Sequence, residues 1–290
     1  MSVRAHLLLP NLLLTAMALL AIQLSGCASW TDRETDQAKS KLPTLKPNAR
    51  SLVLEVEFVP IDVDTTDPDD VQSLWQWVDE TAVDSGTRHV WLANGLRAGR
   101  VVRRERLRSR LETMKSQQNA VDQFLSEAEI ASEVAQGGKR IPMRLGRRYE
   151  LPLREPISGS HVTLVRVKGE TIGQTLTDPQ YLLAVTTNDG QSPKQVEVTL
   201  RPEIQHGAMK QQWVTSDSAL RIDRRREAWS LEELTLRLTA TEGDLFMIAS
   251  TIPRMGLGKQ MLSGNRADSM EQQVILLIRV EKIPTAVSAL

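Results

Sequence analysis

The chain is poor in the residues that most metal and disulfide sites need. Its 290 residues include one cysteine, Cys27, so no disulfide can form within the chain. Beyond His6 in the leader, the histidines are His89, His161 and His206, which are far apart and have no second ligand at metal-binding spacing. Basic and acidic residues number 36 each, so no overall field attracts nucleic acid. We therefore expect no bound metal and no nucleic-acid partner.

Recognisable catalytic motifs are also missing. The run Ser158-Gly159-Ser160-His161 lacks the glycines of a nucleophile elbow. The run Gly256-Leu257-Gly258-Lys259-Gln260 lacks the first glycine and the final hydroxyl of a phosphate-binding loop. Glu232 and Glu233 are adjacent on an expected strand and would point to opposite faces. The sequence predicts no cofactor and favours a protein that is not an enzyme, without excluding one.

The first 26 residues have the build of a signal peptide. Arg4 and His6 give a modest basic start, and an apolar run over residues 7–24 follows. That run is about the minimum length for a membrane-spanning helix, so an uncleaved membrane anchor is the alternative. Either interpretation directs the protein to a membrane.

The residues Leu24-Ser25-Gly26-Cys27 resemble the bacterial lipobox. The resemblance implies cleavage before Cys27 and acyl chains on that residue, and two or three such chains hold a protein on a bilayer almost permanently. Ala28 follows Cys27 where an aspartate would favour the inner membrane. By that pattern we expect lipidation of Cys27 and an outer-membrane location facing the periplasm.

Residues 27–50 are polar, contain two prolines and show no apolar period, which predicts a flexible tether. Residues 51–138 predict a small α+β module. In it, residues 52–59 alternate as a strand ending at Pro60, a helix carries Val71, Leu74 and Trp75, and Asn94-Gly95 suggests a hairpin turn.

A long amphipathic helix is predicted over residues 103–135, because apolar residues recur there at alternating spacings of four and three. A coiled-coil seam for self-association and a helix packed on its own sheet are both compatible with that period. A basic cluster follows at Lys139, Arg140, Arg144, Arg147 and Arg148, and we expect it to be solvated and partly ion-paired.

Residues 139–290 predict an antiparallel, sandwich-like β domain, because short β-type runs alternate there with turn signals. The fold class is thus expected to be α+β, with a small N-terminal module, a long helix and a C-terminal β domain. The expected strands are 161–167, 169–176, 181–187, 195–200, 211–214, 231–238, 245–250 and 274–282. Residues 274–278 are apolar on both faces and should form a central strand.

The C-terminal third resembles the secretin homology region of bacterial secretion channels. The likeness runs through residues 198–204, 242–248, 255–258 and 273–278. It implies a β-rich component that pairs strands with itself or with a partner, as an analogy of fold. The paired glycines expected after the second strand and the closing proline are not in their places.

We expect a lipid-anchored envelope protein that acts through a protein partner or self-association. An envelope hydrolase, or a module that binds a small ligand or polysaccharide, is the alternative. A pocket joining His161 or His206 to carboxylates would favour the alternative, whereas an exposed strand-edged or apolar surface near Trp213 and Trp229 would favour protein contacts.

Overall fold

Strand β13 (Glu271–Lys282) is the centre of the largest sheet. The computed structural model describes residues 51–63, 69–114, 138–215, 220–263 and 271–284, all within one compact unit, residues 47–290. Sheet A has the order β2 (Val78–Asp79), β3 (Leu96–Val101), β12 (Leu245–Ser250), β13, β1 (Leu52–Val63) and β4 (Lys139–Met143). The central position predicted for residues 274–278 is confirmed, because β13 pairs with β12 on one side and β1 on the other.

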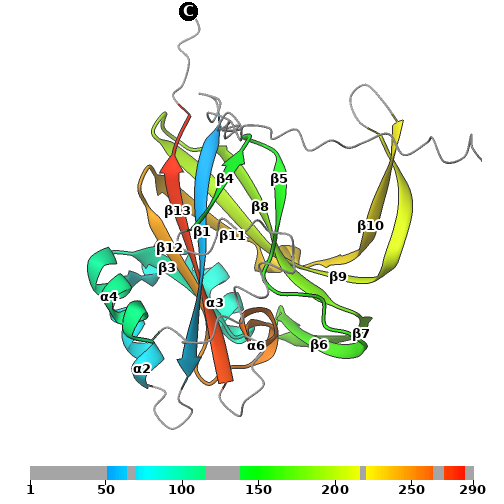
Figure 1. Cartoon of the computed structure of the whole chain (residues 1–290), viewed down its shortest axis with the longest axis horizontal. Helices are drawn as coiled ribbons and strands as arrows, with labels where there is room; N and C mark the ends of the chain where they lie inside the picture. Colours follow the sequence, from blue (N-terminus) through cyan, green and yellow to red (C-terminus); the bar gives the residue numbers. More distant parts are fainter. Residues whose placement is uncertain (1–50, 64–68, 115–137, 216–219, 264–270, 285–290) are drawn as a thin grey trace, which may run out of the picture. The chain divides into compact units, whose positions relative to one another are not determined.

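Two further sheets come from the second half of the chain (Figure 1). Sheet B has the order β10 (Leu220–Ser230), β9 (Gln195–Thr215), β8 (Gln180–Asp189) and β5 (Arg148–Pro152), with β11 (Leu236–Thr241) paired to the first part of β9. Strands β6 (Ser160–Val167) and β7 (Glu170–Thr177) form a separate hairpin. The alternation predicted for β9 is confirmed, because Val196, Val198 and Leu200 are buried and the residues between them are not.

Sheet A has a hydrophobic core on each face. On one face Leu276 and Ile278 of β13 belong to the same apolar cluster as Val198 and Leu200 of sheet B. On the other face Ile275 and its neighbours pack with residues from η1 (Ser73–Trp77) and α4 (Arg104–Met114). This two-sided burial explains why β13 is apolar at every position from 274 to 278.

Residues 69–95, which precede β3, are mostly helical. They contain α2 (Asp69–Gln72), η1, the short strand β2, η2 (Glu80–Ala82) and α3 (Ser85–Ala93). Asp84 caps α3 by accepting hydrogen bonds from the N–H groups of Gly86 and Thr87, both at 2.9 Å. Hydrogen bonding by the Thr87 side chain, followed by these two N–H groups, holds the pKa of Asp84 below its ordinary value. The hairpin predicted at Asn94-Gly95 is wrong, because these residues end α3, with Gly95 at φ +76°.

The α+β fold class is also wrong. Strand residues outnumber helical residues by more than two to one among the described residues. No long amphipathic helix is evident in them: α4 spans Arg104–Met114, and residues 115–135 of the predicted helix lie outside the described part of the chain. Strands from the expected N-terminal module, β1 and β3, share sheet A with the C-terminal strands β12 and β13. The described part of the chain is therefore mostly β.

Two details of the predicted strands differ from the structure. Strand β1 continues through Pro60 to Val63, at a point where β13 flanks it on one side and no described strand flanks it on the other. Proline is tolerated at such an edge. The strand expected at residues 231–238 is instead η4 (Glu232–Leu234) followed by β11. Among the described helices, none has the length and apolar content needed to cross a membrane.

Candidate interaction surface

The distal parts of β9 and β10 form a two-stranded ribbon. The pairing of β9 with β8 ends at Gln205, and its pairing with β11 covers only residues 195–200. Among the described strands, only β10 pairs with residues 206–215 of β9, and its residues 220–227 lie opposite them. We call residues 206–215 and 220–227 the ribbon. Ten extended residues span about 33 Å, so the ribbon continues well beyond the other described strands of sheet B (Figure 1).

The ribbon carries exposed apolar side chains. Met209 is 63% exposed and Ile222 is 54% exposed. Met209 lies on β9 and Ile222 lies on β10, so each strand of the ribbon carries an exposed apolar side chain. A two-stranded ribbon has no core of its own that could bury such residues. Exposed apolar residues on a projecting element are typical of a surface that contacts another protein.

A first set of contacts fixes the ribbon at its base. Residues 207–209 of β9 oppose Arg226 alone in β10, which makes a bulge with Gly207 at φ +70°. The guanidinium of Arg226 donates to the carbonyl of Gly207 at 2.8 Å and also to the carbonyl of Asp178, between β7 and β8. The bulge is thereby tied to a neighbouring loop, and the ribbon leaves sheet B from a fixed point.

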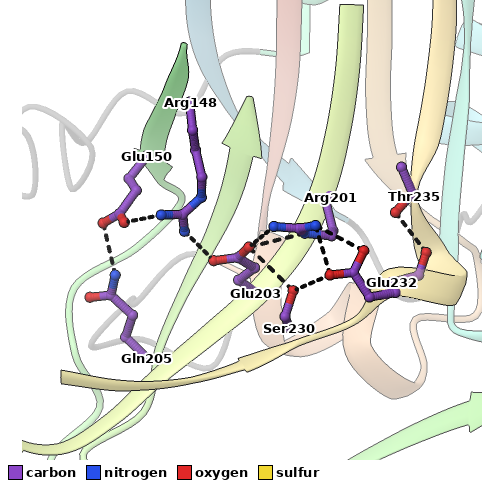
Figure 2. Close-up of polar contacts among 8 residues, drawn as sticks. All are labelled: Arg148, Glu150, Arg201, Glu203, Gln205, Ser230, Glu232 and Thr235. Atoms are coloured by element: carbon purple, nitrogen blue, oxygen red, sulfur yellow. Dashed lines mark hydrogen bonds and ion pairs between the residues drawn. The ribbon is translucent and has the colours of Figure 1, made fainter. Parts of the chain in front are cut away.

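A second set of contacts centres on Glu203 (Figure 2). Its side chain is 3% exposed and accepts hydrogen bonds from Arg148 of β5 and Arg201 of β9. Ser230 of β10 donates to the same carboxylate at 3.3 Å. Because Leu200 and Ile204 face the core, Arg201 and Glu203 lie on the opposite face of sheet B. We call these residues the Glu203 cluster, and they join β5, β9 and β10 where the ribbon begins.

Two more carboxylates neutralise the arginines of the cluster. Arg201 donates to Glu232 at 2.7 and 2.8 Å, and Arg148 donates to Glu150 at 2.7 Å. Burial disfavours the charge of Arg201, but its hydrogen bonds to Glu203 and Glu232 outweigh that effect and raise its pKa. All three carboxylates accept hydrogen bonds from arginine (Figure 2). The cluster therefore holds strands together and offers no free base for catalysis.

The residues considered as catalytic or metal candidates are not brought together. His89 lies in α3, His161 in β6 and His206 in β9. The Nε2 atom of His161 hydrogen-bonds to the carbonyl of Ser158 at 2.8 Å. Within the described ranges there is no group of three or more histidine, cysteine, aspartate or glutamate side chains that could hold a metal ion. Cys27 lies outside the described residues.

The other residues that the sequence offered as candidates lie in helices or ion pairs that give them a structural role. Residues 256–262, which include the glycine-rich run, form helix α6. Glu232 and Glu233 lie in η4, and Glu233 pairs with Lys168 at 3.5 Å. In the basic cluster, Arg140 pairs with Glu281 at 2.8 Å and Arg148 belongs to the Glu203 cluster, so the expected partial ion pairing is confirmed. Trp229 is partly buried against the core at the base of the ribbon.

A cleft of about 460 Å³ lies beside α3. Arg97, Glu80 and Gln72 line it, together with Arg88, Leu92, Thr251 and Ile252. The Arg97 guanidinium pairs with Glu80, donates to Gln72 at 2.9 Å and stacks 4.0 Å from the Trp75 ring. The polar wall of the cleft is thus engaged in its own contacts, which makes the cleft a weaker candidate than the ribbon.

Comparisons with protein-family models, with curated proteins and with solved structures find no match to this chain. The ribbon itself was not predicted from the sequence, which placed only a short strand at residues 211–214. The available signal was short: Trp213-Val214-Thr215 and Leu220-Arg221-Ile222 contain strand-forming residues on both sides of residues 216–219, but most of the remaining ribbon residues are polar or charged.

Proposed function

We propose that the protein is a lipid-anchored cell-envelope component that binds a protein partner through the ribbon. The lipobox resemblance at residues 24–27 supports acylation of Cys27, and Ala28 supports the outer membrane facing the periplasm. The secretin resemblance supports a component that pairs strands with itself or with a partner. An enzyme or ligand-binding module remains the alternative class.

One observation carries this proposal. The ribbon extends past the last strand that could support it, exposes Met209 and Ile222, and is held at its base by Arg226 and the Glu203 cluster. A fixed base reduces the conformational entropy that binding would remove. A partner that covers the exposed apolar side chains would gain their burial.

We expect the double variant Met209→Asp/Ile222→Asp to lose its partner and keep its fold. Two charges on the exposed apolar residues would have to be desolvated in the complex, so the crosslinked adduct from native membranes should fall by roughly 10-fold or more. Quantitative crosslinking, with thermal unfolding as the check on folding, measures this. The matched control is Val102→Asp, because Val102 is 57% exposed on a different part of the protein. Equal adduct from the two variants would contradict a role for the ribbon.

We expect Cys27→Ser to move the protein from the membrane to the soluble fraction, because serine offers no thiol for the acyl chains. Fractionation and mass spectrometry of the mature N-terminus test this. A wild-type mature chain that begins at any residue other than Cys27, or that carries no lipid there, would remove the anchor from the proposal. If soluble Cys27→Ser protein still crosslinks to the partner, the anchor serves to raise the local concentration.

A further inference from the structure

The β6–β7 hairpin has one edge that the rest of the protein covers. The side-chain amide of Asn94 donates to the carbonyl of Arg166 and accepts from its N–H, both at 2.7 Å, as a neighbouring strand would. Gln260 donates to the carbonyl of Val162 at 3.0 Å on the same edge. Strand β6 is therefore the inner strand, next to α3 and α6, and three of its outward-facing backbone groups have partners there (Figure 1).

The opposite edge, on β7, is open. Because Arg166 directs its N–H and C=O away from β7, its register partner Thr171 directs its own away from β6. By the two-residue period of a strand, Gly173 and Thr175 do the same. No described strand pairs with this side of β7, and every residue from Glu170 to Thr175 is exposed. Three residues thus present main-chain donors and acceptors to solvent.

This edge lacks the features that protect the others. The edge strands of the two larger sheets are either very short or carry basic residues or proline. Strand β2 has only two residues. The protecting residues in the others are Lys139, Arg140 and Pro142 in β4, Arg148 and Pro152 in β5, Arg224 to Arg226 in β10, and Arg237 in β11. Charges and proline on an edge discourage pairing with another chain. Residues 171–177 contain neither a charge nor a proline. The β7 edge is therefore suited to pairing.

We propose that two copies of the protein pair through β7, antiparallel, about a twofold axis at Gly173. This arrangement places Gly173 opposite Gly173 and Thr171 opposite Thr175 of the partner. Each of these three pairs has its backbone groups facing the partner, so six N–H to C=O hydrogen bonds form and join two hairpins into a four-stranded sheet. No charged residue opposes its own copy, because Glu170 lies opposite Leu176. This dimer goes beyond the proposed function and uses a different surface from the ribbon.

Apolar side chains support the same axis. Leu164 lies opposite Gly173 in the hairpin, and a Cβ at Gly173 would be 3.0 Å from Leu164 Cδ2. The Leu164 side chain therefore leans over Gly173 toward the open edge. Leu164 is 49% exposed and its neighbour Val162 is 59% exposed. In the dimer each Leu164 side chain leans over its own Gly173 toward the axis, where the partner's β7 helps to shield it from water.

Register-specific disulfides test the dimer. In the full chain with Cys27→Ser, which leaves no other thiol, Thr171→Cys and Thr175→Cys are made separately. Residues in a hydrogen-bonded pair have Cα atoms about 5.5 Å apart, within the range a disulfide can bridge. A mixture of the two variants should give an oxidised dimer, and neither variant should do so alone. No dimer in the mixture, or equal dimer from each variant alone, would overturn the proposed pairing.

Sedimentation velocity provides the second measurement. Thr171→Lys/Thr175→Lys places like charges opposite one another and should raise the dimer dissociation constant roughly 10-fold. Val102→Lys/Thr239→Lys adds the same charge at exposed positions elsewhere and should leave it unchanged. A wild-type chain that stays monomeric at about 100 μM, or a β7 that crosslinks to a different protein, overturns the dimer. The ribbon variant Met209→Asp/Ile222→Asp should dimerise normally, so the two proposals fail separately.

Discussion

Gly258→Ala should strongly destabilise the protein, although it adds a single methyl group. Helix α6 (Gly256–Leu262) packs with Gly258 directly against the turn that ends α3. A Cβ at Gly258 would lie 1.8 Å from the carbonyl oxygen of Gly95 and 2.4 Å from its carbon. Both are backbone atoms, so no side-chain rotation relieves the overlap. The amide of Gly258 also donates to the carbonyl of Asn94 at 2.9 Å, which fixes the close approach.

The expected loss is about 4 kcal/mol of the free energy of unfolding, measured by chemical denaturation. Proteins of this kind have about 5–15 kcal/mol in total, so poor expression or aggregation is the expected phenotype. Gly146→Ala is the control, because a Cβ there meets nothing within 4 Å and only its φ of +74° is unfavourable. That control should cost about 1 kcal/mol. Equal losses at the two positions would show that the α6 contact is adaptable.

The glycines of α6 also illustrate how much sequence motifs can tell. The run Gly256-Leu257-Gly258-Lys259-Gln260 does not complete a phosphate-binding loop, and residues 255–258 were interpreted only through the secretin resemblance. In the structure Gly258 permits a helix to touch a backbone turn 163 residues earlier in the chain, and Gly95 is required there because its Cβ would lie 2.0 Å from the carbonyl oxygen of Met255. No local sequence pattern could predict either contact, because each glycine is required by the backbone of the other segment.

Local patterns predicted a strand correctly where the alternation of residues within that strand reflects its buried and exposed faces. Strand β12 has the bounds predicted for it, Leu245–Ser250, and β6, β7 and β8 differ from their predicted ranges by at most two residues at either end. The alternation of apolar residues in β9 correctly predicted which face is buried. These elements show the two-residue period clearly because one side meets a core and the other meets water or polar side chains.

Patterns failed where distant segments decide the structure. Strand β1 pairs with β13, more than 200 residues away in sequence, so the first strand could not be assigned to the same sheet as the last. Asn94-Gly95 is a strong hairpin signal, yet the Asp84 cap commits the preceding residues to a helix. The ribbon was missed for a related reason. Residues 206–215 project from sheet B because β8 and β11 stop pairing with β9 before them, and the local sequence does not show where that pairing stops.

The candidate site residues also divide into those that a local motif predicts and those that distant segments bring together. Cys27 follows from four consecutive residues, and it stays a prediction because it lies outside the described part of the chain. The Glu203 cluster draws Arg148, Arg201, Ser230 and Glu232 from four separate elements. Only the spacing of Arg201 and Glu203, two residues apart on one face of a strand, was visible beforehand.

Glu203→Ala should lower the free energy of unfolding by about 3 kcal/mol. Removing the carboxylate leaves Arg148 and Arg201 without their shared acceptor, and breaking a buried ion pair typically costs 3–5 kcal/mol. We expect the lower end of that range, because the two arginines are 34% and 28% exposed and keep Glu150 and Glu232 as partners. Chemical denaturation measures the loss. Glu233→Ala is the control, because Glu233 pairs with Lys168 at the surface and should give no measurable change.

The same substitution should loosen the ribbon before it unfolds the protein. Glu203 joins β5, β9 and β10 near the point where β9 loses its pairing with β8. Its loss removes that junction and leaves Arg226 and the 2.8 Å hydrogen bond from Gln205 to Glu150 among the contacts at the base of the ribbon. Hydrogen exchange of the amides in residues 206–211 should therefore accelerate more in Glu203→Ala than exchange in β13, which is buried in sheet A. Uniform acceleration across both elements would mean that the cluster stabilises the whole fold and leaves the ribbon no more ordered than before. A selective effect, combined with weaker crosslinking to the partner, would connect the cluster to binding, because a less ordered ribbon must lose more entropy when it binds.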